Sequence, residues 1–246
     1  MANRVRVDRS QGCPEPIRAL NRVIEQDKGE PMVSIAGRHL RLVVGKKSTI
    51  PWVRERVAEM LIQAVEALPG EICLHVTEAW RPLERQRLIY EFFWESSIRA
   101  YPELGYASRR RLVNRWVAPV DQKAPPGHCT GGAVDVHLHG VDGSALDVTS
   151  PFTRFEGAAT YVLGLTPTAE HHRRVLVAAM LGAGFTNCRD EYWHYSFGDA
   201  AWAVRKGLDT CLYGAVYLDP DLYAEPQRIW LQELATREDP LAHRKV

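Results

Sequence analysis

The stretch AVDVHLHG, residues 133–140, most constrains the fold, because its apolar and polar residues alternate. Such alternation is typical of a half-buried β-strand, whose successive side chains point to opposite faces. One face then packs into a core, while the other carries Asp135, His137 and His139. Buried polar groups need partners, so this second face is expected to meet a cleft. The strand is therefore predicted to support a core on one side and a site on the other.

A loop with two adjacent glycines leads into this strand. Gly131 and Gly132 allow the backbone to turn tightly, and His128 lies seven residues before Asp135. The imidazole and the carboxylate can then lie side by side. Catalytic zinc sites commonly use two histidines and one carboxylate, so these two residues predict part of a zinc site.

The segment RDEYWHYSF, residues 189–197, supplies a second candidate histidine. Glu191 precedes His194 by three residues, a combination of general base and metal ligand that metal-assisted hydrolysis requires. In a regular strand, residues three apart face opposite ways, so this pair can share a cleft only where the strand ends, bends or bulges. His137 or His139 could replace His194 as a ligand, and His194 could instead be a packing residue.

Hydrophobic periodicity and turn residues predict helices and strands in an α+β arrangement. The expected class is a single domain, residues 1–246, with a central mixed or antiparallel sheet flanked by helices. The sequence shows no repeat and no linker that would divide it. Helices are expected over 52–68, 83–101, 106–119 and 169–182, and strands over 72–80, 133–140 and within 183–197.

Composition narrows the class of partner. The formal charge of +1 indicates no electrostatic attraction to nucleic acid or to a membrane, so a small molecule or peptide is the expected partner. The five cysteines are scattered and form no CxxC pair, which favours a reducing compartment over a disulfide framework. The first residues carry charges and lack an apolar segment of signal-peptide length, so a cytoplasmic location is expected. Cys129 beside His128 is expected to be a buried packing residue rather than a nucleophile.

Three motifs resemble those of the zinc D-alanyl-D-alanine dipeptidases, the family that includes the vancomycin-resistance dipeptidases. They are EAWRP at 78–82, HCTGGAVD at 128–135 and EYWH at 191–194, and the resemblance extends over roughly residues 50–215. It implies an α+β zinc peptidase with one Zn²⁺ per chain. The implied ligands are His128, Asp135 and His194, with Glu191 as general base and Arg81 stabilising the tetrahedral intermediate.

The resemblance also implies the substrate, a small dipeptide such as D-Ala-D-Ala or a related D-amino-acid dipeptide, cut by a zinc-activated water. Two positions depart from the family pattern: Pro126 replaces a serine, and Glu156 replaces an aspartate that receives the substrate's amino group. Glu156 is the predicted substrate-binding residue. The alternatives are a peptidoglycan endopeptidase or carboxypeptidase on the same scaffold, or a catalytically silent zinc-fold binding module. The C-terminal extension, residues 226–246, carries no recognised motif, and the sequence does not indicate the oligomeric state.

Overall fold

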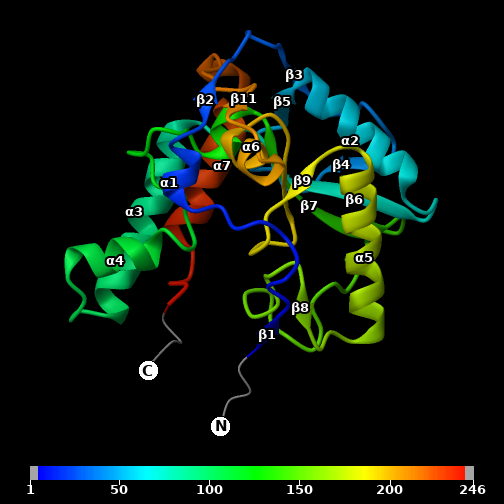
Figure 1. Cartoon of the computed structure of the whole chain (residues 1–246). Helices are drawn as coiled ribbons and strands as arrows, with labels where there is room; N and C mark the ends of the chain where they lie inside the picture. The colour runs from blue at the N-terminus through cyan, green and yellow to red at the C-terminus, as the bar shows by residue number, and fades with distance from the viewer. Residues whose placement is uncertain (1–4, 242–246) are drawn as a thin grey trace.

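The central layer of the protein is a five-stranded sheet with the strand order β4-β6-β7-β10-β9. In the computed structural model, which describes residues 5–241, β4 runs parallel to β6 and the other neighbours are antiparallel. Helices flank this sheet (Figure 1), which confirms the predicted α+β class with a mixed sheet. Its strands are β4 (Leu42–Val44), β6 (Ile72–Glu78), β7 (Ala133–Gly140), β9 (Thr186–Asn187) and β10 (His194–Ser196).

The apolar face of β7 packs as the alternation predicts. Val134, Val136 and Leu138 are buried in the main core, together with side chains of helices α2 (Glu55–Ala67) and α5 (Pro167–Gly182). These two helices lie side by side at one side of the sheet in Figure 1. Burying one Val or Leu side chain contributes about 1.5–3 kcal/mol, so this layer determines which face of β7 turns away from the core.

The register of the sheet brings polar residues of three neighbouring strands to one level. Glu78 of β6 faces Asp135 of β7, and Asp135 faces His194, the first residue of β10. The pairing of β6 with β7 shifts between Val76 and Glu78, as in a β-bulge, a feature that re-aims side chains at strand ends. These polar side chains therefore meet at one place on the sheet.

A second apolar cluster forms a helical wall on the other side of the molecule. It joins α3 (Leu83–Ala100), α4 (Tyr106–Val113) and α7 (Ala224–Ala235) (Figure 1). Trp230 of α7 is buried against Ile89 and Phe93 of α3. The described part of the C-terminal extension is therefore a packed element of the fold, which the absence of a motif did not indicate.

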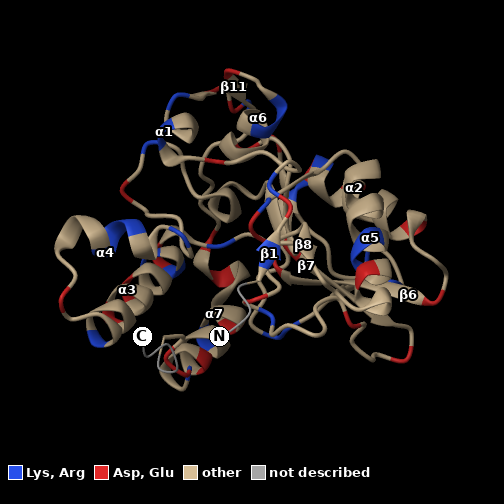
Figure 2. Cartoon of the chain, turned by 60° about the horizontal axis from the view of Figure 1, so that its bottom comes forward, with Lys and Arg blue, Asp and Glu red and all other residues tan. Residues whose placement is uncertain are grey.

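Short elements complete the described chain. No helix among residues 5–241 has the length and apolar character needed to cross a membrane. Basic and acidic residues are distributed over the molecule in Figure 2, in keeping with the near-neutral charge. The remaining strands pair as β1 (Arg6–Val7) with β8 (Val162–Leu163), β2 (Ile24–Glu25) with β11 (Thr210–Cys211), and β3 (Met32–Ser34) with β5 (Trp52–Arg54); the other helices are α1 (Ile17–Leu20), α6 (Ala200–Lys206) and the 3₁₀ turns η1 (Gly127–Thr130) and η2 (Pro220–Leu222).

Three predicted elements differ from those observed. The helix expected over 52–68 begins at Glu55, because residues 52–54 are held extended by pairing with β3. The helix expected over 106–119 ends at Val113. The segment 183–197 is a hairpin of β9 and β10 rather than one strand, because the chain turns between residues 188 and 193.

Candidate active site

His128 is held by a short 3₁₀ turn whose end requires glycine. Gly131, at φ +72°, adopts the left-handed conformation that terminates this turn, and a Cβ there would lie 2.5 Å from the sulfur of Met32. The side chain of His128 is buried, and its Nδ1 lies 3.0 Å from the carbonyl oxygen of Ala79. Because Nδ1–H donates to that carbonyl, Nε2 is left as the available ligand atom.

The available atom of His128 faces the same carboxylate as His194. His128 Nε2 lies 3.3 Å from Asp135 Oδ1, and His194 Nδ1 lies 3.0 Å from that oxygen. Burial acts to raise the pKa of Asp135, but the two imidazoles outweigh it and hold the pKa well below its ordinary value. The carboxyl group is therefore ionised, as a metal ligand must be.

These three side chains fit a zinc ion. Their donor atoms all lie within 4.8 Å of one another. Tetrahedral zinc with bonds of about 2.0–2.2 Å places neighbouring ligand atoms about 3.3–3.6 Å apart, close to the 3.3 and 3.0 Å that separate the imidazole nitrogens of His128 and His194 from Asp135 Oδ1. Three protein ligands also leave a fourth position for water or substrate, the arrangement of catalytic rather than structural zinc sites.

The alternative histidines of β7 lie elsewhere. Within residues 5–241, neither His137 nor His139 belongs to a group of three or more potential ligands. His139 stacks on His75 with ring centroids 3.7 Å apart, and its Nδ1 lies 3.1 Å from the carbonyl oxygen of Gly143. Burial, with the charge of Arg154, lowers the pKa of His137 to about 4. The geometry therefore favours His194 as the third ligand.

Glu191 reaches the site because the chain turns before β10 begins. The amide of His194 donates to the carbonyl oxygen of Glu191 at 3.1 Å, which closes the turn and allows residues three apart to share one cavity. Burial raises the pKa of Glu191 to about 7. A carboxylate whose pKa lies near neutrality is suited to accept and return a proton.

Arg81 is tied to His128 and to the helix that follows it. Its amide donates to the carbonyl oxygen of His128 at 3.1 Å, and its NH2 lies 3.4 Å from Glu78 Oε2. Its NH1 donates to Gln86 Oε1, and Gln86 Nε2 donates to the carbonyl oxygen of Ala118 at 2.8 Å. Glu78 and Gln86 therefore orient Arg81, although the sequence did not single them out. The signal that could have indicated Gln86 was a polar residue on the inward face of an amphipathic helix.

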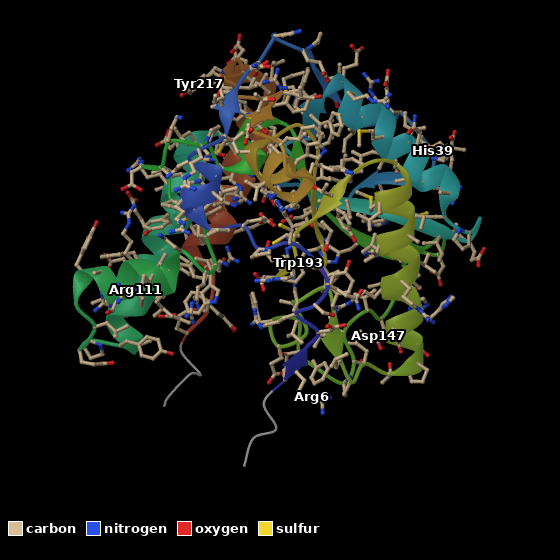
Figure 3. All side chains as sticks on the ribbon, in the orientation of Figure 1. Arg6, His39, Arg111, Asp147, Trp193 and Tyr217 are labelled. Carbon is tan, nitrogen blue, oxygen red and sulfur yellow. The ribbon has the colours of Figure 1, made fainter. Side chains whose placement is uncertain are left out.

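A cavity of about 570 Å³ joins these groups and lies in the range typical of ligand pockets. The helical wall contributes Phe93 and Trp230 to its lining. Trp193, labelled in Figure 3, lines it on the side of the sheet. Five of the six predicted site residues line this one cavity: Arg81, His128, Asp135, Glu191 and His194.

The sequence profile of the D-Ala-D-Ala dipeptidase family, peptidase family M15, matches residues 54–211, more than half of the chain. The chain belongs to the D-Ala-D-Ala dipeptidase family. This confirms the resemblance inferred from the three motifs and places the chain among the zinc metallopeptidases. Together with the His-Asp-His donor set, it indicates zinc as the metal of the site.

The sequence identity to individual relatives is low. The D-alanyl-D-alanine dipeptidase of Escherichia coli (strain K12) is 27% identical over 129 residues, which are 52% of this chain and 56% of that protein. The match thus spans about half the length of the relative.

Solved structures of vancomycin-resistance enzymes are also similar. A variant of the D,D-pentapeptidase VanY in complex with Zn(II) is 16% identical, with 82% of this chain and 93% of the other covered at a TM-score of 0.43. VanYB in complex with D-alanine-D-alanine is 16% identical, with 82% and 91% covered at 0.44. The D,D-dipeptidase VanXYg in complex with a D-Ala-D-Ala phosphinate analogue is 20% identical, with 84% and 67% covered at 0.37.

The structure does not place Glu156 beside the other predicted site residues. Glu156 lies in an exposed loop, and its Oε2 accepts hydrogen bonds from the amide and hydroxyl of Thr153 at 3.1 and 2.8 Å. The loop contributes Arg154 and Phe155 to the cavity lining instead. The role of ammonium receptor therefore stays a prediction that the geometry does not favour.

Cys129 has the environment expected of a packing residue. It is 1% exposed, and burial raises the pKa of its thiol to about 12. A thiol with this pKa is almost entirely protonated at neutral pH, and the thiolate is the nucleophilic form. The environment of Cys129 is therefore that of a packing residue and not of a nucleophile.

We expect Gln86→Ala to lower kcat by roughly tenfold to a hundredfold with a smaller change in KM, since small displacements of a catalytic group are costly. Steady-state kinetics on a cleaved dipeptide measures this. Gln86→Glu keeps the oxygen that accepts from Arg81 and is expected to retain much more activity. Both variants lose the hydrogen bond from Gln86 Nε2 to Ala118, and only Gln86→Glu keeps the acceptor for Arg81. Equal losses of activity would therefore contradict a role of Gln86 in positioning Arg81.

Proposed function

We propose that the protein is a zinc-dependent peptidase that hydrolyses short peptides ending in D-amino acids, with D-Ala-D-Ala or a related dipeptide as the first candidate. The main support for this proposal is that one cavity is lined by His128, Asp135, His194, Glu191 and Arg81. A purely structural metal site needs neither a buried carboxylate beside the ligands nor an oriented guanidinium, so a silent binding module is disfavoured.

The metal ligands and the general base have different roles in the proposed reaction. His128 Nε2, the Asp135 carboxylate and His194 Nδ1 would hold zinc, which when bound supplies Lewis-acid activation of water and of the scissile carbonyl. The Glu191 carboxylate accepts the proton of the attacking water and then delivers it to the leaving amine. Its raised pKa favours both transfers, because neither protonation state is strongly preferred near neutrality.

Arg81 acts on charge that develops during the reaction. As water adds to the carbonyl, negative charge grows on its oxygen, and a fixed guanidinium stabilises that charge more than it stabilises the substrate. Glu78 and Gln86 hold Arg81 in place before the reaction, so little reorganisation is needed.

A carboxypeptidase acting on longer peptides is the second candidate, and the position of Glu156 favours it. A dipeptidase needs an anion for the free amino group of its substrate. The residue predicted for that role lies in an exposed loop and is engaged with Thr153, so it does not line the cavity.

A panel of free and N-acetylated dipeptides tests both candidates. We expect zinc-loaded protein to cleave D-Ala-D-Ala or another DD-dipeptide faster than its LL counterpart, and to lose this activity on chelation. Comparable cleavage of N-acetyl-D-Ala-D-Ala would select the carboxypeptidase. Failure to cleave any free or acetylated DD-substrate would overturn the proposed function.

A further inference from the structure

The segment from β1 to the end of α1 contributes to the lining of the cavity. In Figure 1 this dark blue chain runs from β1 up to α1 across the front of the molecule. Its residues Glu15, Ile17 and Leu20 line the cavity. The family profile begins at residue 54, so this segment precedes the matched part of the chain. A part of the protein that the family match does not include therefore helps to form the site.

Glu15 is fixed by an ion pair that leaves one of its oxygens available. Its Oε1 accepts a hydrogen bond from Arg205 Nε at 2.7 Å, and the side chains of Glu15 and Arg205 are 17% and 4% exposed. Within residues 5–241, no hydrogen bond or ion pair engages Glu15 Oε2, and the protein does not fully enclose this oxygen. Glu15 therefore offers a positioned anionic oxygen to a ligand.

Asp199 adds a second negative charge beside Glu15. It is 1% exposed, and its Oδ1 accepts from the hydroxyl of Ser196 at 2.8 Å. The Ser196 oxygen in turn accepts from Arg205 NH1 at 3.0 Å. In the described part of the chain Asp199 Oδ2 is buried without a partner, and it lies beside Gly127, the residue before His128. Glu15 and Asp199 thus form an acidic side of the cavity, next to a metal ligand.

The two carboxylates of this acidic side share one guanidinium. Burial acts to lower the pKa of Arg205, but the Glu15 carboxylate and, less strongly, Asp199 raise it above its ordinary value. Among residues 5–241, Glu15 forms an ion pair with Arg205 alone, and Asp199 forms none. One negative charge is therefore left over. Because a buried carboxylate without a cation is costly, a cationic ligand is favoured here.

The acidic side lies within reach of the reacting groups. Burial is the main cause of the raised pKa of Glu191, and the charge of Glu15 is a smaller one, so the two carboxylates lie close enough to interact. In a dipeptide, the carbon next to the scissile carbonyl carries the free amino group. A receptor for that group must therefore lie close to the metal ligands and the general base, as Glu15 and Asp199 do.

We infer that Glu15 Oε2 receives the free ammonium group of a dipeptide substrate, and that Asp199 supplies the second negative charge of this subsite. The inference rests on the proposed peptidase function and specifies its substrate class: dipeptides with a free amino terminus, rather than acylated or longer peptides. Arg205 is a positioning residue, because it holds Glu15 at the cavity. Glu15 thus takes the role that the sequence assigned to Glu156.

A pair of substrates that differ only in this charge tests the inference. D-Ala-D-Ala is compared with D-lactoyl-D-alanine, in which a hydroxyl replaces the ammonium group and the scissile amide is unchanged. We expect kcat/KM to be about tenfold higher, or more, for D-Ala-D-Ala at neutral pH, the usual effect of a hydrogen bond to a charged group. A ratio near one in the unmodified protein would overturn the inference.

Glu15→Gln should reduce that ratio several-fold. Glutamine keeps an oxygen that can accept from Arg205 Nε, so the segment stays attached while the charge is lost. Asp209→Asn removes an exposed carboxylate after α6, outside the cavity lining, and should leave the ratio unchanged. If Glu15→Gln lowered kcat/KM equally for both compounds, Glu15 would only tether the N-terminal segment, and the inference would be wrong.

Binding separates this inference from the proposed function. Titration calorimetry with the Glu191→Gln protein compares the same two compounds without turnover. If the unmodified protein cleaves both equally well and both bind equally tightly, the ammonium subsite is wrong and the peptidase stands. If neither compound is cleaved, but D-Ala-D-Ala binds more tightly and Glu15→Gln abolishes the difference, the subsite is supported and the peptidase is contradicted.

Discussion

Replacement of Glu191 by glutamine is expected to leave zinc binding intact and to lower kcat by about two to four orders of magnitude, the usual contribution of a general base. Glutamine has nearly the same size, so the turn that His194 closes on the Glu191 carbonyl is preserved. An amide, however, has negligible basicity and leaves the attacking water without a proton acceptor. Metal analysis and steady-state kinetics on the same preparation measure the two properties separately.

Glu66→Gln serves as the matched control, because Glu66 is exposed on α2, away from the cavity. It should behave as the unmodified protein in both measurements. If turnover in Glu191→Gln stayed within a factor of about three of normal, Glu191 would not be the general base, because loss of a general base lowers turnover far more than that. Loss of zinc from Glu191→Gln would instead assign it to the metal site.

Replacement of His194 by alanine should lower the zinc content well below one per chain after dialysis and reduce activity by roughly a thousandfold or more. The metal supplies several kcal/mol of transition-state stabilisation, and each 1.4 kcal/mol corresponds to a factor of ten. The substitution also leaves the buried Asp135 carboxylate with one imidazole partner instead of two. Elemental analysis of dialysed protein, with kinetics, checks both effects.

His139→Ala distinguishes the ligand assignment from its alternative. His139 lies on the same strand as Asp135 and stacks on His75, outside the metal group. We expect this variant to keep one zinc per chain and near-normal kcat. Zinc that persists in His194→Ala but is lost in His139→Ala would reverse the assignment.

Local sequence pattern was sufficient to predict the sheet position of the site. The alternation of residues 133–140 determined which side chains of β7 face the core, because a strand has a period of two and only one face could be apolar. The short loop from His128 to Asp135 placed these residues close together, since Gly131 permits the left-handed turn between them. The Glu191–His194 spacing remained ambiguous until the turn before β10 was seen.

Only the tertiary structure decided which residues complete the cavity. Gln86 lies in α3, and Arg237 follows α7. Packing of the helical wall against the sheet brings both residues to the cavity. Glu156 and Arg154 occupy one loop, where backbone conformation directs Arg154 over Trp193 and leaves Glu156 bonded to Thr153. Local patterns are set by short-range backbone periodicity, whereas these contacts depend on how distant elements pack. The sequence by itself therefore predicted the candidate metal ligands, and the tertiary structure decided which other side chains line the cavity with them.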